Sequence, residues 1–218
     1  MNREWSELNK TMQQQIKKQE TFDEGIDTLL LLRKKMMEQI LEFRDILAPE
    51  DFHAIPFINA DGYHSKTIAY SLYHIFRIED IVANSLIRKE EEIYFTGHYQ
   101  ERMKSPIITT GNELVKQEIA DFSMKLDLDA LYQYVAEVNT GTTELLKQIT
   151  YRDLKTKMTE QDRENLRLLG VVSKDESAVW LIDYWCNKNI QGLIKMPFSR
   201  HWIMHVEASL RIKNKILR

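Results

Sequence analysis

The sequence contains a single cysteine, Cys186, so no disulfide can form within the chain. It also has only seven glycines and four prolines in 218 residues, which leaves long stretches free of the residues that interrupt helices. The single cysteine excludes a small domain stabilised by disulfide bonds. The scarcity of glycine and proline favours long regular elements within one sizeable domain, since the chain is too short to make two domains the default.

Neither charge sign dominates, because 30 basic residues face 33 acidic ones and the formal net charge is −3. Proteins that hold a phosphate backbone carry a basic excess, so nucleic acid is not an expected partner. The longest apolar runs, such as residues 29–32, are far shorter than the roughly 20 residues of a membrane-spanning helix, and no membrane partner is expected. The N-terminal residues are polar where a signal peptide would be apolar, which predicts a cytoplasmic location.

Apolar residues recur at alternating intervals of three and four, which is the spacing of one helix face and predicts an all-α protein. The clearest series consists of Leu128, Leu131, Val135, Val138, Thr142, Leu145 and Ile149. Similar stripes predict long helices at about 22–47 and about 65–87, and another from Ser199, a predicted N-cap, to the end of the chain. Four long amphipathic helices predict a four-helix bundle.

The connections between these helices are expected to be irregular and to contain extra short helices. Residues 91–123 are too many for a tight turn, so we expect a long crossover connection around the outside of the bundle. Within it, Thr110 and Glu113 have the spacing of a capping box at the start of a short helix.

Two further segments are predicted to be helical. Residues 177–198, which contain Trp180 and Trp185, are expected to form a short helix over one end of the bundle. Residues 1–21 form a polar N-terminal helical extension with little apolar area to hold it down. Residues 22–218 are predicted to be a single domain.

Two of the six histidines, His201 and His205, stand four residues apart in "RHWIMH". On an α-helix such positions are separated by about 40° around the axis, so both imidazoles can bind one metal ion. They continue an inward-facing apolar stripe, so each needs a partner when buried. Hydrogen bonds to a carbonyl or carboxylate are the commoner reason for such a pair, and this interpretation stays open. Trp202 stands where the zinc-peptidase helix has glutamate, so that class of peptidase is not expected.

A third ligand would have to come from another element, and His74 in "SLYHIFRIEDIVAN" is the candidate. It lies on the flank of the apolar seam of the helix predicted at 65–87, where we expect it to be at least half buried. A hydrogen-bonded core histidine fits this position as well. His53, His64 and His98 lie in or near connecting segments and are weaker candidates.

The stretches "SLYHIFRIEDIVAN" and "PFSRHWIMH" together resemble the DinB-like superfamily of bacterial metalloproteins. The region "TTGNELVKQEIADFSMKLDLDALYQY" is similar to the middle part of that family, and the resemblance covers most of the chain from about Phe22 onward. It implies an up-down-down-up four-helix bundle in which one histidine of the second helix and an H-x-x-x-H pair of the last helix bind a divalent metal. Carried onto this sequence, the metal ligands are His74, His201 and His205.

Three imidazoles suit zinc, nickel, iron or copper and do not distinguish among them. Three protein ligands with an open position are typical of a catalytic metal. The resemblance implies thiol-dependent chemistry, with a low-molecular-weight thiol such as bacillithiol or mycothiol as co-substrate. We therefore expect a metal-dependent thiol S-transferase acting on a small electrophile. A non-catalytic metal-binding or small-ligand-binding stress-response protein and a metal-dependent hydrolase remain alternatives, and a homodimer is a further expectation.

Charged residues near the histidines have two interpretations each. Glu79 shares the apolar stripe of its helix, so it would either orient a metal-binding histidine or form a salt bridge with Arg77 or another basic neighbour. Arg200 and Glu207 flank the histidine pair, where they would either meet an anionic substrate or face solvent.

Aromatic residues and the cysteine complete the candidates. Tyr70, Tyr73, Trp180 and Trp185 would line the mouth of a pocket, although aromatic residues at such spacings are more often part of the core. Cys186 is predicted to be a buried thiol without a nucleophilic role.

Overall fold

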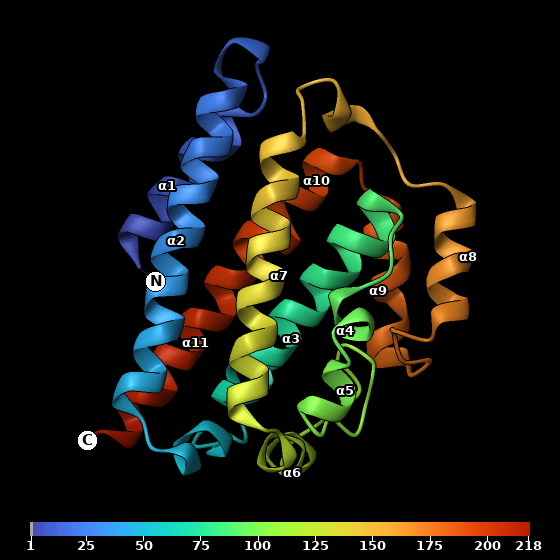
Figure 1. Ribbon diagram of the computed structural model, residues 1–218. Helices are drawn as coiled ribbons and strands as arrows, with labels where there is room; N and C mark the ends of the chain where they lie inside the picture. Colours follow the sequence, from blue (N-terminus) through green and yellow to red (C-terminus); the bar gives the residue numbers. More distant parts are fainter. Residues whose placement is uncertain (1) are drawn as a thin grey trace.

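The computed structural model of the protein describes residues 2–218, and every regular element within that range is helical (Figure 1). The expected all-α class is therefore confirmed. Four long helices run side by side, namely α2 (Phe22–Ile46), α3 (Ile68–Asp80), α7 (Leu128–Gln148) and α11 (His201–Ile216). No helix in the described range is long and apolar enough to cross a membrane.

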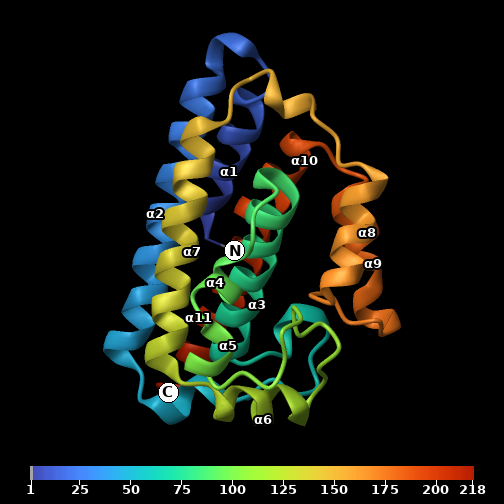
Figure 2. The ribbon, with the colours of Figure 1, turned by 45° about the vertical axis from the view of Figure 1, so that its right-hand side comes forward.

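Further helices occupy the chain before and between these four, and of them only α1 is as long as α3. They are α1 (Arg3–Gln15), α4 (Ile93–Thr96), α5 (Tyr99–Arg102), α6 (Gln117–Lys125), α8 (Glu160–Leu169), α9 (Glu176–Cys186) and α10 (Ile190–Lys195). The segment with α4, α5 and α6 connects α3 to α7, and α6 lies at the lower end of the bundle in Figure 2. The segment with α8 to α10 connects α7 to α11, and α8 and α9 form a separate pair at the side of the molecule.

Helix α2 follows directly from the apolar spacing of its sequence. Its most deeply buried side chains are Leu29, Leu32, Met36, Ile40 and Phe43. They repeat at intervals of three and four, so they form a single face that packs into the core. The helix ends at Ile46, shortly before Pro49, because a proline and the residue before it disfavour continuation of the helix.

Helix α3 is the innermost element, and all of its residues from Ile68 to Asp80 are buried. It begins where the Thr67 side chain accepts a hydrogen bond of 3.0 Å from the backbone N–H of Tyr70. It packs against both α7 and α11. The helix predicted at 65–87 is therefore present, but it starts at Ile68 and its last turns, Ile81–Arg88, widen into a π-helix.

Helix α11 begins at His201, and the prediction that Ser199 caps it is wrong. The Ser199 hydroxyl donates to the Ile194 carbonyl at 3.0 Å, inside a π-helical segment, Met196–Arg200, that joins α10 to α11. Because Pro197 has no N–H, the regular α-helical hydrogen bond is missing there and the chain forms a wider turn instead of a new start.

The predicted capping box at Thr110 is also wrong. The Glu113 carboxylate accepts a hydrogen bond from the Thr109 hydroxyl, and the next helix, α6, begins only at Gln117. Gly111 has φ of 76°, so the chain turns through the left-handed region at this point and cannot enter a helix.

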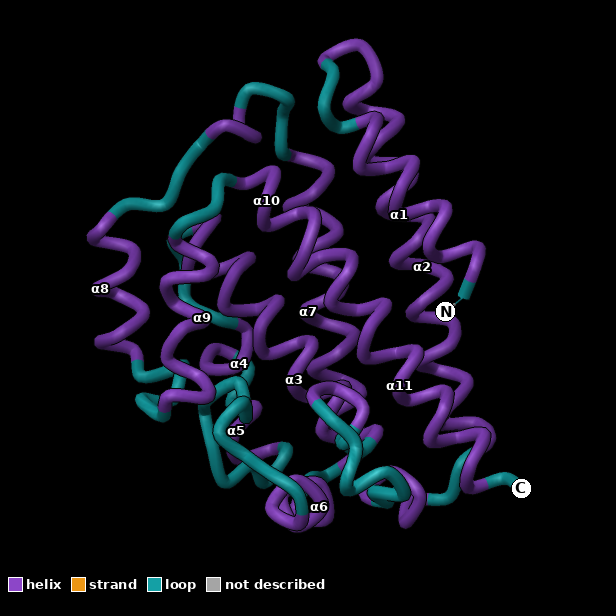
Figure 3. The backbone as a smooth tube through the Cα atoms, turned by 180° about the vertical axis from the view of Figure 1, so that it is seen from behind, coloured by secondary structure: helices purple, strands orange, loops and turns teal. Residues whose placement is uncertain are grey.

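The N-terminal helix α1 packs along α2, as seen from behind in Figure 3. Despite the polar composition of α1, its Trp5 and Met12 side chains are buried in the core. Ile16, which follows just after the end of α1, is buried too. Gly25 of α2 permits the close approach, because a Cβ at this position would lie 2.6 Å from Cγ2 of Ile16.

Candidate metal centre

Three histidines converge in the interior of the bundle. His74 comes from α3, while His201 and His205 come from the first turns of α11, and their exposed fractions are only 4%, 7% and 4%. One ring nitrogen of each lies within 4.8 Å of the others. The Nε2 atoms of His74 and His201 are 3.1 Å apart. Three buried histidines therefore lie close enough to bind one metal ion.

The separations fit a transition-metal site. Metal–imidazole bonds of about 2.0–2.1 Å place tetrahedral ligand atoms about 3.3 Å from one another. The Nε2 atoms of His74 and His201 already have nearly this separation, at 3.1 Å. All three ligand atoms lie within 4.8 Å of one another.

A backbone carbonyl orients His74. Its Nδ1–H donates to the carbonyl oxygen of Thr110 at 2.8 Å, which leaves the Nε2 lone pair directed at the other two rings. The ring of Tyr70 stacks on the imidazole at a centroid distance of 5.4 Å and an interplanar angle of 11°. The left-handed turn at Gly111 is what presents the carbonyl. No sequence pattern marks this partner, because every residue has a carbonyl.

Burial keeps all three imidazoles neutral near pH 7. Removal from water lowers the pKa of His74 from 6.5 to about 4, partly opposed by its hydrogen bond to Thr110. Burial, reinforced by the neighbouring imidazoles, holds the pKa values of His201 and His205 well below the usual range. The neutral form is the one that binds a metal, so the site needs no proton release near pH 7.

The hydrogen bonds of His201 and His205 argue against the interpretation in which a carbonyl or carboxylate holds each ring. Within the described residues, the Nδ1 atoms of both rings are buried and have no hydrogen-bond partner. The carbonyl or carboxylate partners that an ordinary core histidine would have are therefore missing for these two rings. A metal ion bound to one nitrogen of each ring would compensate part of the cost of burying them.

A cavity of about 360 Å³ opens directly onto the three histidines. Aromatic rings form much of its wall, and the side chains of Ile78, Leu181, Met196 and Met204 add apolar surface. The aromatic residues are Tyr63, Tyr70, Trp180, Tyr184 and Trp185. The expected pocket-lining roles of Tyr70, Trp180 and Trp185 are therefore met, while Tyr73 lies elsewhere, with its hydroxyl 2.9 Å from the Thr109 carbonyl.

Glu79 has the second of the two roles expected for it, a salt bridge with a basic neighbour, and that neighbour is Arg33 rather than Arg77. Its carboxylate forms a buried ion pair with Arg33 of α2 at 2.6 Å and accepts a hydrogen bond from the Trp202 indole at 2.7 Å. Arg77 pairs instead with Glu92 at 2.8 Å. The sequence could not reveal the Arg33 pair, because it joins two helices that are distant along the chain.

The residues that flank the histidine pair lie outside the cavity. Arg200 is exposed, and the Glu207 carboxylate accepts a hydrogen bond from the backbone N–H of Asn2. His64 lies just before α3 and accepts a hydrogen bond of 2.6 Å from Arg211, and His98 is exposed.

Cys186 is buried as expected, and its burial raises the pKa of the thiol, which makes it a poor nucleophile. Sequence reasoning missed several cavity residues, including Tyr184 of α9. Three more of them are Tyr63, Lys66 and Asn112. All three lie in connecting segments without a periodic pattern, so no sequence signal distinguishes them.

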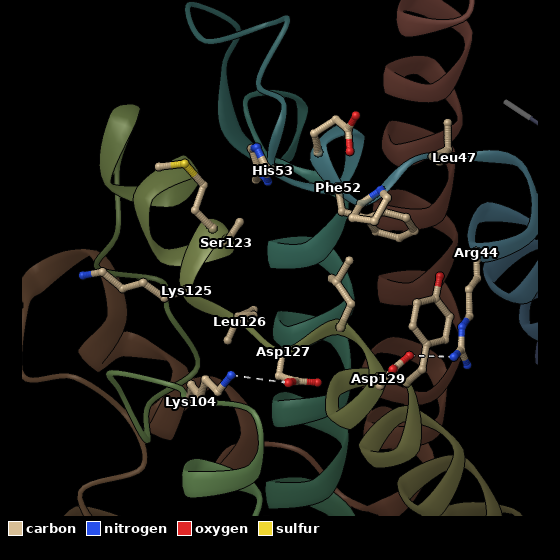
Figure 4. Close-up of a pocket in the computed structure, with 15 residues that line it drawn as sticks. Arg44, Leu47, Phe52, His53, Lys104, Ser123, Lys125, Leu126, Asp127 and Asp129 are labelled. Atoms are coloured by element: carbon tan, nitrogen blue, oxygen red, sulfur yellow. Dashed lines mark hydrogen bonds and ion pairs between the residues drawn. The ribbon is translucent and has the colours of Figure 1, made fainter.

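A second, larger cavity of about 790 Å³ lies between the end of α2, the start of α7 and α6 (Figure 4). His53 lines it. Its arginine and one of its lysines are already paired, Arg44 with Asp129 at 2.6 Å and Lys104 with Asp127 at 3.6 Å. Among the described residues, no metal-ligating cluster lies in this cavity.

The chain matches no protein-family model and no curated protein sequence. Its fold is similar to the crystal structure of a conserved protein from Enterococcus faecalis. The two superpose with a TM-score of 0.60 over 84% of this chain and 92% of that chain, at 13% sequence identity. At this identity the likeness shows a shared fold and nothing about activity.

Proposed function

We propose that this protein binds one divalent metal ion through His74, His201 and His205, in an up-down-down-up bundle of the DinB-like type. The observation that carries the proposal is the convergence of three neutral, buried imidazoles on a cavity, two of them without another partner. The course of the chain supports the bundle type, since α2 and α11 descend in Figure 1 while α3 and α7 ascend.

Within this proposal the protein is a thiol S-transferase that acts on a small electrophile in the cytoplasm. A divalent metal with three protein ligands supplies an open position at which the pKa of a thiol is lowered. The thiol would lose its proton to solvent, and its sulfur would bond to the electrophilic carbon while the bond from that carbon to its leaving group breaks; the leaving group would depart with the bonding electrons and take a proton from solvent. The aromatic wall of the cavity excludes water and holds the electrophile beside the histidines.

The lining of the cavity favours a thiol over water as the nucleophile. A metal-dependent hydrolase usually has a carboxylate that takes the proton from the attacking water. The residues that line this cavity include no aspartate or glutamate. A thiol is far more acidic than water, so it has less need of such a base. The same lining is compatible with a non-catalytic metal-binding protein, which is the second candidate.

Elemental analysis of protein purified without a metal-affinity tag tests the metal site. We expect about one metal ion per chain in the wild type, and loss of the metal in His74→Ala and His205→Ala. His98→Asn is the matched control, because His98 is exposed and its φ of 51° suits asparagine. Equal metal content in all four proteins would refute the site.

Cobalt substitution then separates a catalytic from a structural site. At an open site, added thiols change the visible spectrum of the cobalt, whereas removal of the metal leaves the bundle folded. A fully ligated structural metal gives no spectral response, and its removal unfolds the protein. Thiol transfer at full rate by metal-free protein would overturn the transferase proposal.

A further inference from the structure

Lys66 is the one lysine or arginine among the residues that line the histidine cavity. It precedes Thr67, the N-cap of α3, so the start of the innermost helix fixes its backbone. Its side chain is partly buried, with the ammonium 4.9 Å from the centroid of the Tyr70 ring, and the same ring stacks on His74. The Lys66 side chain therefore lies beside the metal-binding group.

Unlike Arg44 and Lys104 of the other cavity, Lys66 has no anionic partner. In Figure 4, Arg44 faces Asp129 and Lys104 faces Asp127, so these charges are already compensated. Within residues 2–218, no carboxylate forms an ion pair with Lys66, and none lines the cavity around it. Burial without such a partner also lowers the pKa of Lys66. A partly buried cation without a counter-ion is an unfavourable arrangement unless a ligand supplies the opposite charge.

The other residues of the cavity indicate the shape and polarity of the rest of that ligand. Trp180 and Tyr184 of α9 form an aromatic pair at its rim, with ring centroids 5.6 Å apart, and Trp180 is 48% exposed. An exposed tryptophan at the mouth of an apolar cavity is a favourable surface for a flat or aliphatic group. The volume of about 360 Å³ lies at the lower end of the range for small-molecule sites.

We propose that the cavity selects a small monocarboxylate with an apolar body, whose carboxylate lies between Lys66 and the three histidines while its body packs against Trp180 and Tyr184. This inference rests on the proposed metal site, because the metal would add positive charge beside Lys66. A neutral ligand of the same shape would leave that charge uncompensated in a site of low dielectric. Lys66 is thus a specificity-determining residue.

Ligand titration into cobalt-loaded protein tests this selectivity. The probes are benzoate and hexanoate, compared with the neutral benzyl alcohol, and binding is followed by calorimetry and by the visible spectrum of the cobalt. We expect the carboxylates to bind at least 10-fold more tightly than the alcohol. Lys66→Gln should weaken carboxylate binding about 10- to 100-fold, the effect of losing one charged hydrogen bond, and leave the alcohol unaffected.

Two further variants identify the cause of any change. Lys66→Arg should keep most of the carboxylate affinity, because it keeps the charge. Lys34→Gln, which removes an exposed lysine of α2, should behave as the wild type. Equal affinities for benzoate and benzyl alcohol, or unchanged benzoate binding in Lys66→Gln, would overturn the inference.

Metal content measured on each preparation separates this inference from the proposed function. If the wild type binds no metal, the proposed metal site fails, and the same titration is carried out on the metal-free protein. Carboxylate binding that depends on Lys66 would then still support the inference. The absence of any carboxylate binding by the metal-free protein in that case would overturn both.

Discussion

Acidification from pH 7 to pH 5 is expected to destabilise the metal-free protein by about 2 kcal/mol or more. The cause is the burial of three neutral imidazoles, since the folded state holds the pKa of His74 at about 4 and those of His201 and His205 well below their ordinary value. An unfolded chain returns each ring to about 6.5, so between these values the unfolded state binds more protons than the folded state.

The sign and size follow from this difference. The stability that comes from keeping the rings neutral is present above pH 6.5. It is lost as the pH falls towards the folded pKa, because protons then bind the unfolded state more strongly. For His74, with a folded pKa of about 4, the loss between pH 7 and pH 5 is about 2 kcal/mol. The other two rings add to this loss in the same direction, because burial also lowers their folded pKa values.

Urea unfolding at pH 7, 6 and 5, in the presence of a chelator and followed by the helical circular dichroism signal, measures this loss. His74→Gln removes the ring with a folded pKa of about 4, so its stability should fall by about 2 kcal/mol less across the same range. His98→Asn should show the full loss, because His98 is exposed. Glu92 acts in the opposite direction, since burial raises its pKa and acid then favours the folded state. A wild-type loss below about 2 kcal/mol would refute the reasoning about the buried imidazoles.

Three further predictions concern the metal and the packing. Zinc at 100 times its dissociation constant should stabilise the protein by about 2.7 kcal/mol at pH 7, measured as a shift of the urea midpoint, and an unchanged midpoint would argue against a site formed only in the folded state. Arg33→Met should cost about 3–5 kcal/mol, because it leaves the buried Glu79 carboxylate without its partner. Adding Glu79→Gln to Arg33→Met should restore part of that lost stability in the same assay. If the two substitutions instead lower the stability additively, the pairing of Arg33 with Glu79 is contradicted. Gly25→Ala should lower the stability measured by thermal unfolding by about 1–3 kcal/mol, because its Cβ would lie 2.6 Å from Ile16. Gly170→Ala meets no neighbouring atom, so it tests the cost of a positive φ alone.

The long helices could be predicted from the sequence because their signal is local. The spacing of buried residues such as Leu29, Leu32 and Met36 repeats with the period of the helix itself. The predictions went wrong where a single residue changes the backbone. Pro197 displaced the start of the last helix from Ser199 to His201, and Gly111 turned the chain away from the helix expected after Thr110.

The candidate metal site was also predictable from the sequence only in its local part. The sequence by itself determined that His201 and His205 share one face of a helix, because positions four apart are neighbours in any α-helix. Only the tertiary structure brought His74, 127 residues from His201, to within 3.1 Å of it. The crossing of α3 over α11 sets that distance, and it depends on packing along the whole length of both helices rather than on local spacing. The Thr110 carbonyl and the unpaired charge of Lys66 were likewise decided by tertiary structure, since neither carries a sequence pattern.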